Sequence, residues 1–182
     1  MNETVAALLQ EFSLDLYRPI IRRNLDLGPA LPPRAGNLVK VVTGMRRSGK
    51  SYRLFQEMDD LMRAGVPQER ICYFNFEDDR LGRVVPATGD QVIEAFRYLH
   101  PGLAEEDGLY LFFDELQEME GWGSWLRRIV DTTKATIYVS GSSSKMLSSE
   151  IATEFRGRAI DFELLPFSFR EIVAQDPSLA PS

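Results

Sequence analysis

The sequence predicts an α/β fold of three layers, in which a mainly parallel sheet of five strands lies between helices. Short apolar runs alternate with segments of helical periodicity over residues 38–164, which is typical of parallel strands connected by covering helices. A glycine-rich segment, residues 44–51, stands between the first apolar run and the first helical segment. The chain of 182 residues is long enough to bury one core.

Strands and helices are assigned from the spacing of apolar residues. Helical periodicity covers residues 50–64, 91–99 and 122–133. Residues 1–27 also show near-helical spacing, so we expect one or two short helices there, interrupted by Pro19. The apolar runs assigned to strands are residues 38–42, 71–76, 109–113, 135–139 and 160–164. The side chains expected to face the sheet from the first predicted helix of the domain are Tyr52, Leu54, Phe55, Met58, Leu61 and Met62.

The composition excludes several classes of protein. Hydrophobic residues make up 44% and charged residues 26% of the chain, a mixture typical of soluble globular domains. A formal net charge of −6 disfavours a general electrostatic grip on nucleic acid. The single cysteine, Cys72, cannot form an internal disulfide and is expected to be a small buried side chain. No apolar run approaches the roughly 20 residues of a membrane helix, so we expect a cytoplasmic protein without a membrane partner.

Residues 44–51 match the phosphate-binding pattern G-x-x-x-x-G-K-[ST], and they occur after a predicted strand and at the start of a predicted helix. The fold is therefore expected to be the three-layer sandwich of the P-loop nucleoside triphosphatases. Gly44 and Gly49 permit the backbone angles that turn successive N–H groups toward phosphates. Lys50 would reach the β- and γ-phosphates of ATP, and Ser51 would bind Mg²⁺. The predicted nucleotide-binding residues are Gly44, Met45, Arg46, Arg47, Ser48, Gly49, Lys50, Ser51 and Tyr52.

The third predicted strand ends in a pair of acidic residues, Asp114 and Glu115. Ligand chemistry in open α/β sheets occurs at the carboxyl ends of the strands. Asp114 is therefore a predicted metal ligand beside Ser51. Glu115 is the predicted catalytic base, which would polarise a water for attack on the γ-phosphate.

Two further segments offer catalytic side chains. The fourth predicted strand ends in Ser140 and a run of Gly and Ser, and Ser140, with Ser142 as second choice, could hydrogen-bond the γ-phosphate or the attacking water. The same residues are also ordinary turn and capping chemistry. Arg158 or Arg156 could stabilise the charge on the transferred phosphoryl group from a neighbouring subunit, or could form a surface salt bridge instead.

The combined motifs resemble the predicted ATPases of the AAA superfamily in bacteria and archaea whose second half is a domain of unknown function. The resemblance implies a catalytic Glu beside a metal-binding Asp, a polar sensor strand between the phosphate-loop strand and the acid-pair strand, and an arginine motif that favours Arg158 over Arg156. Ser140 departs from the Thr common in such proteins but keeps the hydroxyl, and the second half is absent. The resemblance rests on residues 44–51, 75–78, 80–81, 113–117, 122, 140–147, 157–158 and 165–171.

The chain is accordingly divided into three parts. Residues 1–37 are an N-terminal helical extension and loop, residues 38–175 are the P-loop ATPase domain, and residues 176–182 have the composition of a linker.

The predicted function is Mg-dependent binding and hydrolysis of ATP by an AAA-type domain that drives or switches a larger assembly. The adjacent Glu115 favours water over a hydroxyl group as the phosphoryl acceptor. Two alternatives stay open: a nucleotide-gated interaction module with little turnover, and a small-molecule kinase built on the same loop. The partners considered are ATP, a homo-oligomer that supplies Arg158 in trans, and DNA or another protein.

Overall fold

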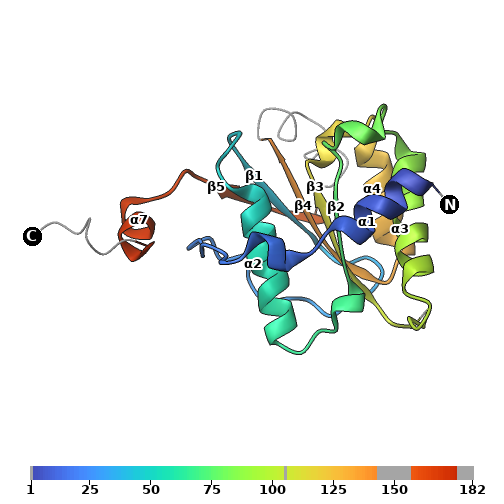
Figure 1. Ribbon diagram of the computed structural model, residues 1–182, viewed down its shortest axis with the longest axis horizontal. Coiled ribbons are helices and arrows are strands. Elements are labelled where there is room, and N and C mark those ends of the chain that lie inside the picture. The colour runs from blue at the N-terminus through green and yellow to red at the C-terminus, as the bar shows by residue number, and fades with distance from the viewer. Residues whose placement is uncertain (1, 105, 143–156, 176–182) are drawn as a thin grey trace, which may run out of the picture.

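The computed structural model describes residues 2–104, 106–142 and 157–175 of the chain (Figure 1). Its strands are β1 Val39–Gly44, β2 Ile71–Asn75, β3 Leu109–Asp114, β4 Ala135–Ser142 and β5 Ala159–Leu164. Its α-helices are α1 Glu3–Glu11, α2 Lys50–Arg63, α3 Pro86–Leu99, α4 Trp122–Thr132 and α7 Phe169–Gln175. Short 3-10 helices are found at Leu14–Tyr17, Gln68–Arg70, Asp79–Leu81 and Leu116–Glu118.

The five strands form one sheet in the order β2-β3-β4-β1-β5, and every neighbouring pair is parallel. The predicted fold class is therefore confirmed. The order also places β4 between β1 and β3, which is where the family resemblance located the sensor strand. Since all strands run the same way, the residues that follow β1, β3 and β4 emerge at one edge of the sheet.

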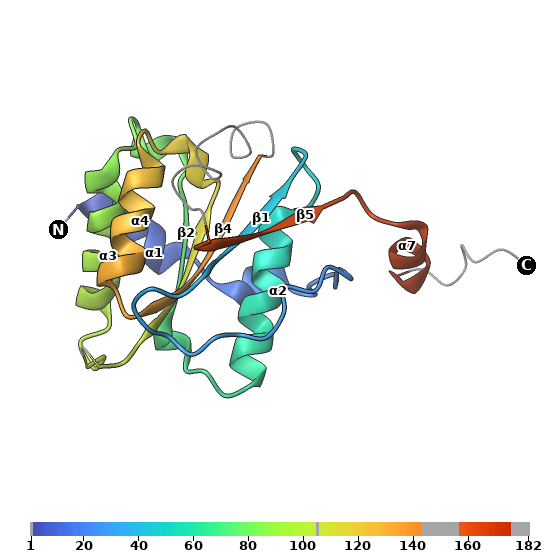
Figure 2. The same cartoon turned by 180° about the vertical axis from the view of Figure 1, so that it is seen from behind.

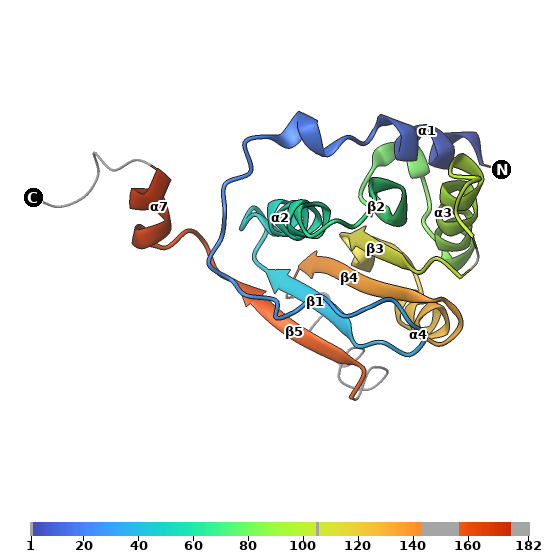
Figure 3. The same ribbon diagram turned by 90° about the horizontal axis from the view of Figure 1, so that it is seen from below.

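Each face of the sheet carries its own core because side chains alternate along a strand. Val42, Tyr73 and Phe112 belong to the cluster formed with α2, whereas Val41 and Cys72 belong to the cluster formed with α1, α3 and α4. Figure 3 shows α2 and α4 on opposite sides of the sheet. This arrangement explains the nearly continuous burial of β1 and β3, whose residues are covered from both sides.

The N-terminal extension differs from the prediction. Helical structure ends at Tyr17, before Pro19, and residues 18–33 run as extended chain past α2 (Figure 3). The one or two short helices predicted within residues 1–27 are found as α1 and the 3-10 helix Leu14–Tyr17, but the near-helical spacing of apolar residues after Pro19 does not form a helix. These residues follow α2 because polar groups beside them bond to that helix: Arg23 N–H donates to Gln56 Oε1 at 2.7 Å.

Several element boundaries also differ. α3 begins at Pro86, five residues before the predicted start, because proline fits the first turn of a helix. α7 was not predicted, and it stands beyond the end of β5, apart from the sheet (Figure 2). Tyr52, expected to face the sheet, is 43% exposed. Its ring lies at the surface of α2, where it meets Tyr17 and Phe55 edge-on.

The close approach of α3 and α4 depends on Gly89. A Cβ atom at Gly89 would lie 2.4 Å from Trp125 Cζ2, and the Trp125 indole is buried. We expect Gly89→Ala to lower the free energy of unfolding by about 1–2 kcal/mol, because overpacking outweighs the roughly 1 kcal/mol by which alanine favours a helix. Gly102→Ala is the matched control, since a Cβ there meets no atom within 4 Å. Urea denaturation measures both variants, and equal stability of Gly89→Ala and wild type would contradict the packing argument.

Candidate nucleotide-binding and active site

Residues 45–49 form a tight loop between β1 and α2. Gly49 and Arg47 have left-handed backbone angles, with φ of 91° and 64°. A Cβ atom at Gly44 would lie 2.5 Å from the carbonyl oxygen of Leu164 and 2.8 Å from Ser48 Oγ, so a side chain has no room there. The Ser48 hydroxyl is buried and has no hydrogen-bond partner among the described residues. A loop of this form, with a spare buried hydroxyl, fits a phosphate group.

The loop lysine and the second residue of the acid pair meet in space. Lys50 Nζ lies 3.4 Å from Glu115 Oε1 and donates a hydrogen bond to the carbonyl oxygen of Met45 at 3.2 Å. Lys50 is buried, and the Glu115 side chain is 17% exposed. The structure therefore brings together two of the predicted catalytic residues, although 65 positions separate them in the chain.

Asp114 is fully buried at the end of β3. One carboxylate oxygen accepts a hydrogen bond from the Tyr73 phenol at 2.6 Å, and the other accepts from the Ser140 hydroxyl. Ser140 Oγ in turn accepts from the backbone N–H of Glu115 at 3.0 Å. The Ser140 side chain, predicted to contact the γ-phosphate or the attacking water, is thus bonded to both members of the acid pair.

Burial controls the protonation of two neighbouring groups on β2. Burial and, after it, the nearby charge of Asp114 hold the pKa of the Tyr73 phenol well above its usual value, so the phenol remains a hydrogen-bond donor. Burial also raises the pKa of the Cys72 thiol. Cys72 is fully buried, which confirms the structural interpretation of this cysteine.

Arg158 lies near the amino-terminal ends of the strands, whereas the phosphate loop, residues 44–51, follows the carboxyl-terminal end of β1. It immediately precedes β5, and β5 pairs in parallel with β1 so that Gly44 is opposite Leu164, not opposite the start of the strand. Arg158 and Leu164 are six residue steps apart along the strand, or roughly 20 Å. Arg158 forms an ion pair with Asp131 of α4. Within one chain Arg158 does not approach residues 44–51, while Arg156 and residues 143–147 lie outside the described residues.

Arg23 was missed by the sequence analysis. Its buried guanidinium donates to the carbonyl oxygen of Ser48 in the phosphate loop at 2.7 Å and to that of Leu165 after β5 at 2.6 Å. It also pairs with Glu171 of α7 at 3.0 Å and lies 4.2 Å from the centroid of the Phe167 ring. No motif marks Arg23, and the only signal in the sequence was the Arg22-Arg23 doublet directly after two isoleucines.

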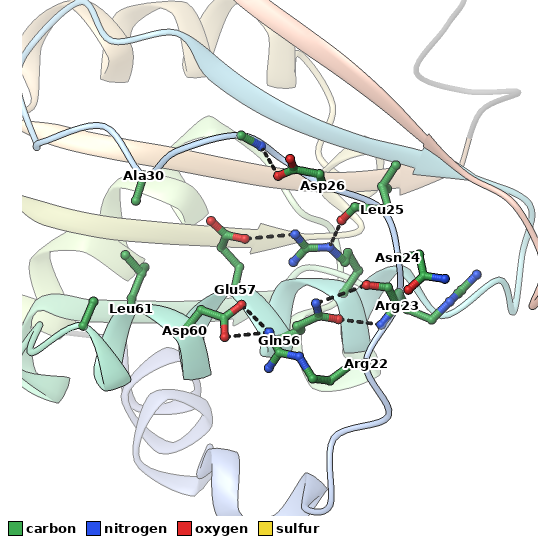
Figure 4. A pocket seen from close by; sticks show the side chains of 13 residues that line it. Arg22, Arg23, Asn24, Leu25, Asp26, Ala30, Gln56, Glu57, Asp60 and Leu61 are labelled. Carbon is green, nitrogen blue, oxygen red and sulfur yellow. Dashed lines mark hydrogen bonds and ion pairs between the residues drawn. The ribbon is translucent and has the colours of Figure 1, made fainter. Parts of the chain in front are cut away.

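A cavity of about 630 Å³ lies between residues 22–30 and α2 (Figure 4). Polar contacts cross it: Arg22 pairs with Asp60 at 2.8 Å, as Figure 4 shows. Arg53 donates a hydrogen bond to the carbonyl oxygen of Leu25 at 2.9 Å. None of residues 44–51 lines this cavity. The contacts fix the N-terminal extension along α2, and they therefore also fix Arg23 beside the phosphate loop.

In the part of the chain that the structure describes, no helix combines the length and the apolar character needed to cross a membrane.

Comparisons with known proteins identify relatives of this chain. A family model described as an AAA domain matches residues 36–173. An uncharacterized protein of Methanocaldococcus jannaschii is 38% identical over 166 residues, which cover 91% of this chain and 34% of that protein. An uncharacterized protein of Haemophilus influenzae is 34% identical over 158 residues, which cover 87% of this chain and 38% of that protein. The chain thus spans about a third of the length of these curated relatives.

A solved structure has a similar fold. It is a DNA polymerase III, gamma subunit-related protein from Thermotoga maritima, with a TM-score of 0.50 and 13% identity. The similarity covers 89% of this chain and 49% of that protein. At this identity the likeness concerns the fold alone.

The contacts of Glu171, including the ion pair with Arg23, predict that the stability of the fold depends on pH. Burial by itself raises the pKa of Glu171, but hydrogen bonds from Asn24 N–H, from Ser168 and from Arg23 outweigh it and lower the pKa to about 2. Because the folded pKa lies below the usual value near 4.5, the stabilisation is complete above that value and is lost as the pH falls toward 2.

We expect Glu171→Gln to lower the free energy of unfolding by about 2 kcal/mol at pH 7, because it leaves the Arg23 charge without its partner. The difference from wild type should shrink between pH 4.5 and 2, as the wild-type carboxylate takes up its proton. Urea denaturation at several pH values measures this difference. Glu94→Gln is the control, because Glu94 is exposed and forms no ion pair within the described part of the chain. A difference that does not change with pH would contradict the assignment.

Proposed function

The chain belongs to the AAA-domain family, and from this premise we propose that it binds Mg-ATP at residues 44–51 and hydrolyses it with Glu115 as the base. One observation carries the proposal: Lys50 Nζ and Glu115 Oε1 lie 3.4 Å apart at the carboxyl edge of the sheet. A nucleotide bound here would have a cation for its phosphates and a carboxylate for the attacking water, which are the two groups that hydrolysis of a phosphoanhydride uses.

The phosphate loop, residues 44–51, supplies the binding energy for the nucleotide. α2 begins at Lys50, so its partial positive charge and its free N–H groups are directed at the loop. Lys50 adds a point charge for the β- and γ-phosphates. On binding, we propose that Lys50 exchanges its contact with Glu115 for one with the phosphates, and this exchange releases the Glu115 carboxylate.

The residues present fit a magnesium ion bound with the nucleotide. Ser51 and Asp114 carry hard oxygen ligands of the kind that magnesium prefers. Asp114 forms no ion pair with a Lys or Arg among the described residues, so its charge is available to a metal. The metal would offset the charge on the β- and γ-phosphates, which is its usual contribution in this chemistry.

Glu115 is held where a base is needed. Its backbone is left-handed, with φ of 50°, and the hydroxyl of Ser140 accepts its N–H. Gln117 Nε2 lies 2.5 Å from Glu115 Oε2, which leaves Oε1 as the oxygen facing Lys50. Once Lys50 moves to the phosphates, Oε1 can accept a proton from the attacking water.

A nucleotide-gated module with little turnover in the isolated chain is the second candidate. It is favoured by the position of Arg158, which lies at the end of the strands far from residues 44–51 of the same chain.

We propose that a neighbouring subunit supplies Arg158, so that turnover needs a homo-oligomer. The cycle would then drive or switch a larger assembly, and a protein or DNA partner is compatible with this role.

Lys50→Ala is expected to weaken ATP binding by about a hundredfold or more, because the main cation of the phosphate site is lost. Glu115→Gln is expected to keep ATP binding and to lower kcat by about 10²–10⁴, because the base is lost. Calorimetric titration and phosphate release measure the two effects. Lys134→Ala, which removes a lysine outside the loop, is the control. Unchanged ATP affinity in Lys50→Ala would falsify the phosphate-loop assignment.

Mixing two inactive variants tests the role of Arg158. We expect Arg158→Ala and Glu115→Gln to be slow when separate, and phosphate release to recover when they are mixed, since one subunit then offers Glu115 and its neighbour offers Arg158. Arg128→Ala, which removes an arginine of α4 that pairs with Asp90 of α3, is the control for general surface effects. A mixture no faster than its components, with a wild-type rate per molecule independent of protein concentration, would contradict catalysis between subunits.

A further inference from the structure

Asp114 is a buried carboxylate held by two neutral hydroxyl groups. It has no exposed surface, and among the described residues no Lys or Arg pairs with it. Tyr73 donates to Oδ2 at 2.6 Å, and Ser140 donates to Oδ1. The donors come from β2 and β4, the two strands that flank β3. One donor for each oxygen fixes the rotation of the carboxylate and leaves its charge uncompensated.

The Tyr73 ring is itself fixed on both sides. The Phe12 ring, directly after α1, stacks on it with 4.3 Å between centroids. The Phe55 ring of α2 meets it edge-on at 5.1 Å. The phenol therefore reaches Asp114 from a position that the N-terminal extension and the phosphate-loop helix both define.

We propose that Tyr73 is a positioning residue, whose hydroxyl orients the Asp114 carboxylate to receive the magnesium ion of Mg-ATP. The inference rests on the proposed function and assigns Tyr73 a part in it. Packing alone needs only the ring, because a phenylalanine would fill the same space between Phe12 and Phe55. The hydroxyl is what connects Tyr73 to the site, since a charge-assisted hydrogen bond to a carboxylate is short and directional.

A second tyrosine in the same core provides a matched control. Tyr138 is fully buried on β4, and its hydroxyl donates to Glu57 of α2 at 3.1 Å. Tyr73→Phe and Tyr138→Phe each remove one buried bond from a phenol to a carboxylate, and both keep the ring. Tyr73→Phe alone alters a bond to the acid pair.

The experiment measures the Kd of ATP by calorimetric titration with Mg²⁺ and, separately, with EDTA. The gain in affinity that wild type obtains from Mg²⁺ is expected to fall by about tenfold in Tyr73→Phe, while the Kd in EDTA stays the same. Tyr138→Phe should keep both values. Thermal unfolding of the two variants, expected to shift by similar amounts, separates this effect from general loss of stability.

The outcomes are distinct. Wild type that gains nothing from Mg²⁺ would overturn the proposed metal site, and the inference with it. A normal gain in wild type and an equal gain in Tyr73→Phe would overturn the inference alone. If Tyr138→Phe also loses the increase in ATP affinity that Mg²⁺ gives, the inference about Tyr73 would be overturned. The cause would then be general packing of the core.

Discussion

The parallel pairing of β1, β4 and β3 is the constraint on which the rest of the site depends. It delivers the ends of three strands to one edge of the sheet, so that Lys50 lies within 3.4 Å of Glu115. An antiparallel neighbour would send one of these ends to the opposite edge. Both faces of the sheet are covered by helices, and the pairing is therefore buried and cannot slip without exposing apolar residues.

A buried negative charge is the second organising element. Removing the Asp114 carboxylate from water is costly, and hydrogen bonds from Tyr73 and Ser140 offset this cost without neutralising the charge. The same Ser140 hydroxyl accepts the N–H of Glu115, so the two acids are oriented by one side chain. A site built in this way is oriented before any ligand arrives, which is the basis of electrostatic preorganisation.

The N-terminal extension and α7, which lie outside the sheet, also contact the residues of the site or their neighbours. Arg23 of the N-terminal extension bonds to the phosphate loop and to Glu171 of α7, and it therefore connects three segments distant in sequence. Arg158 stands at the other edge, paired with Asp131. The predicted phosphate loop and Arg158 therefore lie at opposite ends of the strands.

The sequence by itself determined the phosphate loop, the acid pair and the alternation of strands and helices, because each is encoded by residues adjacent in the chain. The near-helical spacing of apolar residues continues past Pro19, but no helix forms there because Arg18, Arg22 and Arg23 bond to α2. Only the tertiary structure decided that Tyr73 bonds Asp114, that Arg23 bonds the loop, and that Arg158 lies far from it. These contacts depend on which strands are neighbours in the sheet and on how the N-terminal extension lies along α2, and neither leaves a periodic signal in the sequence.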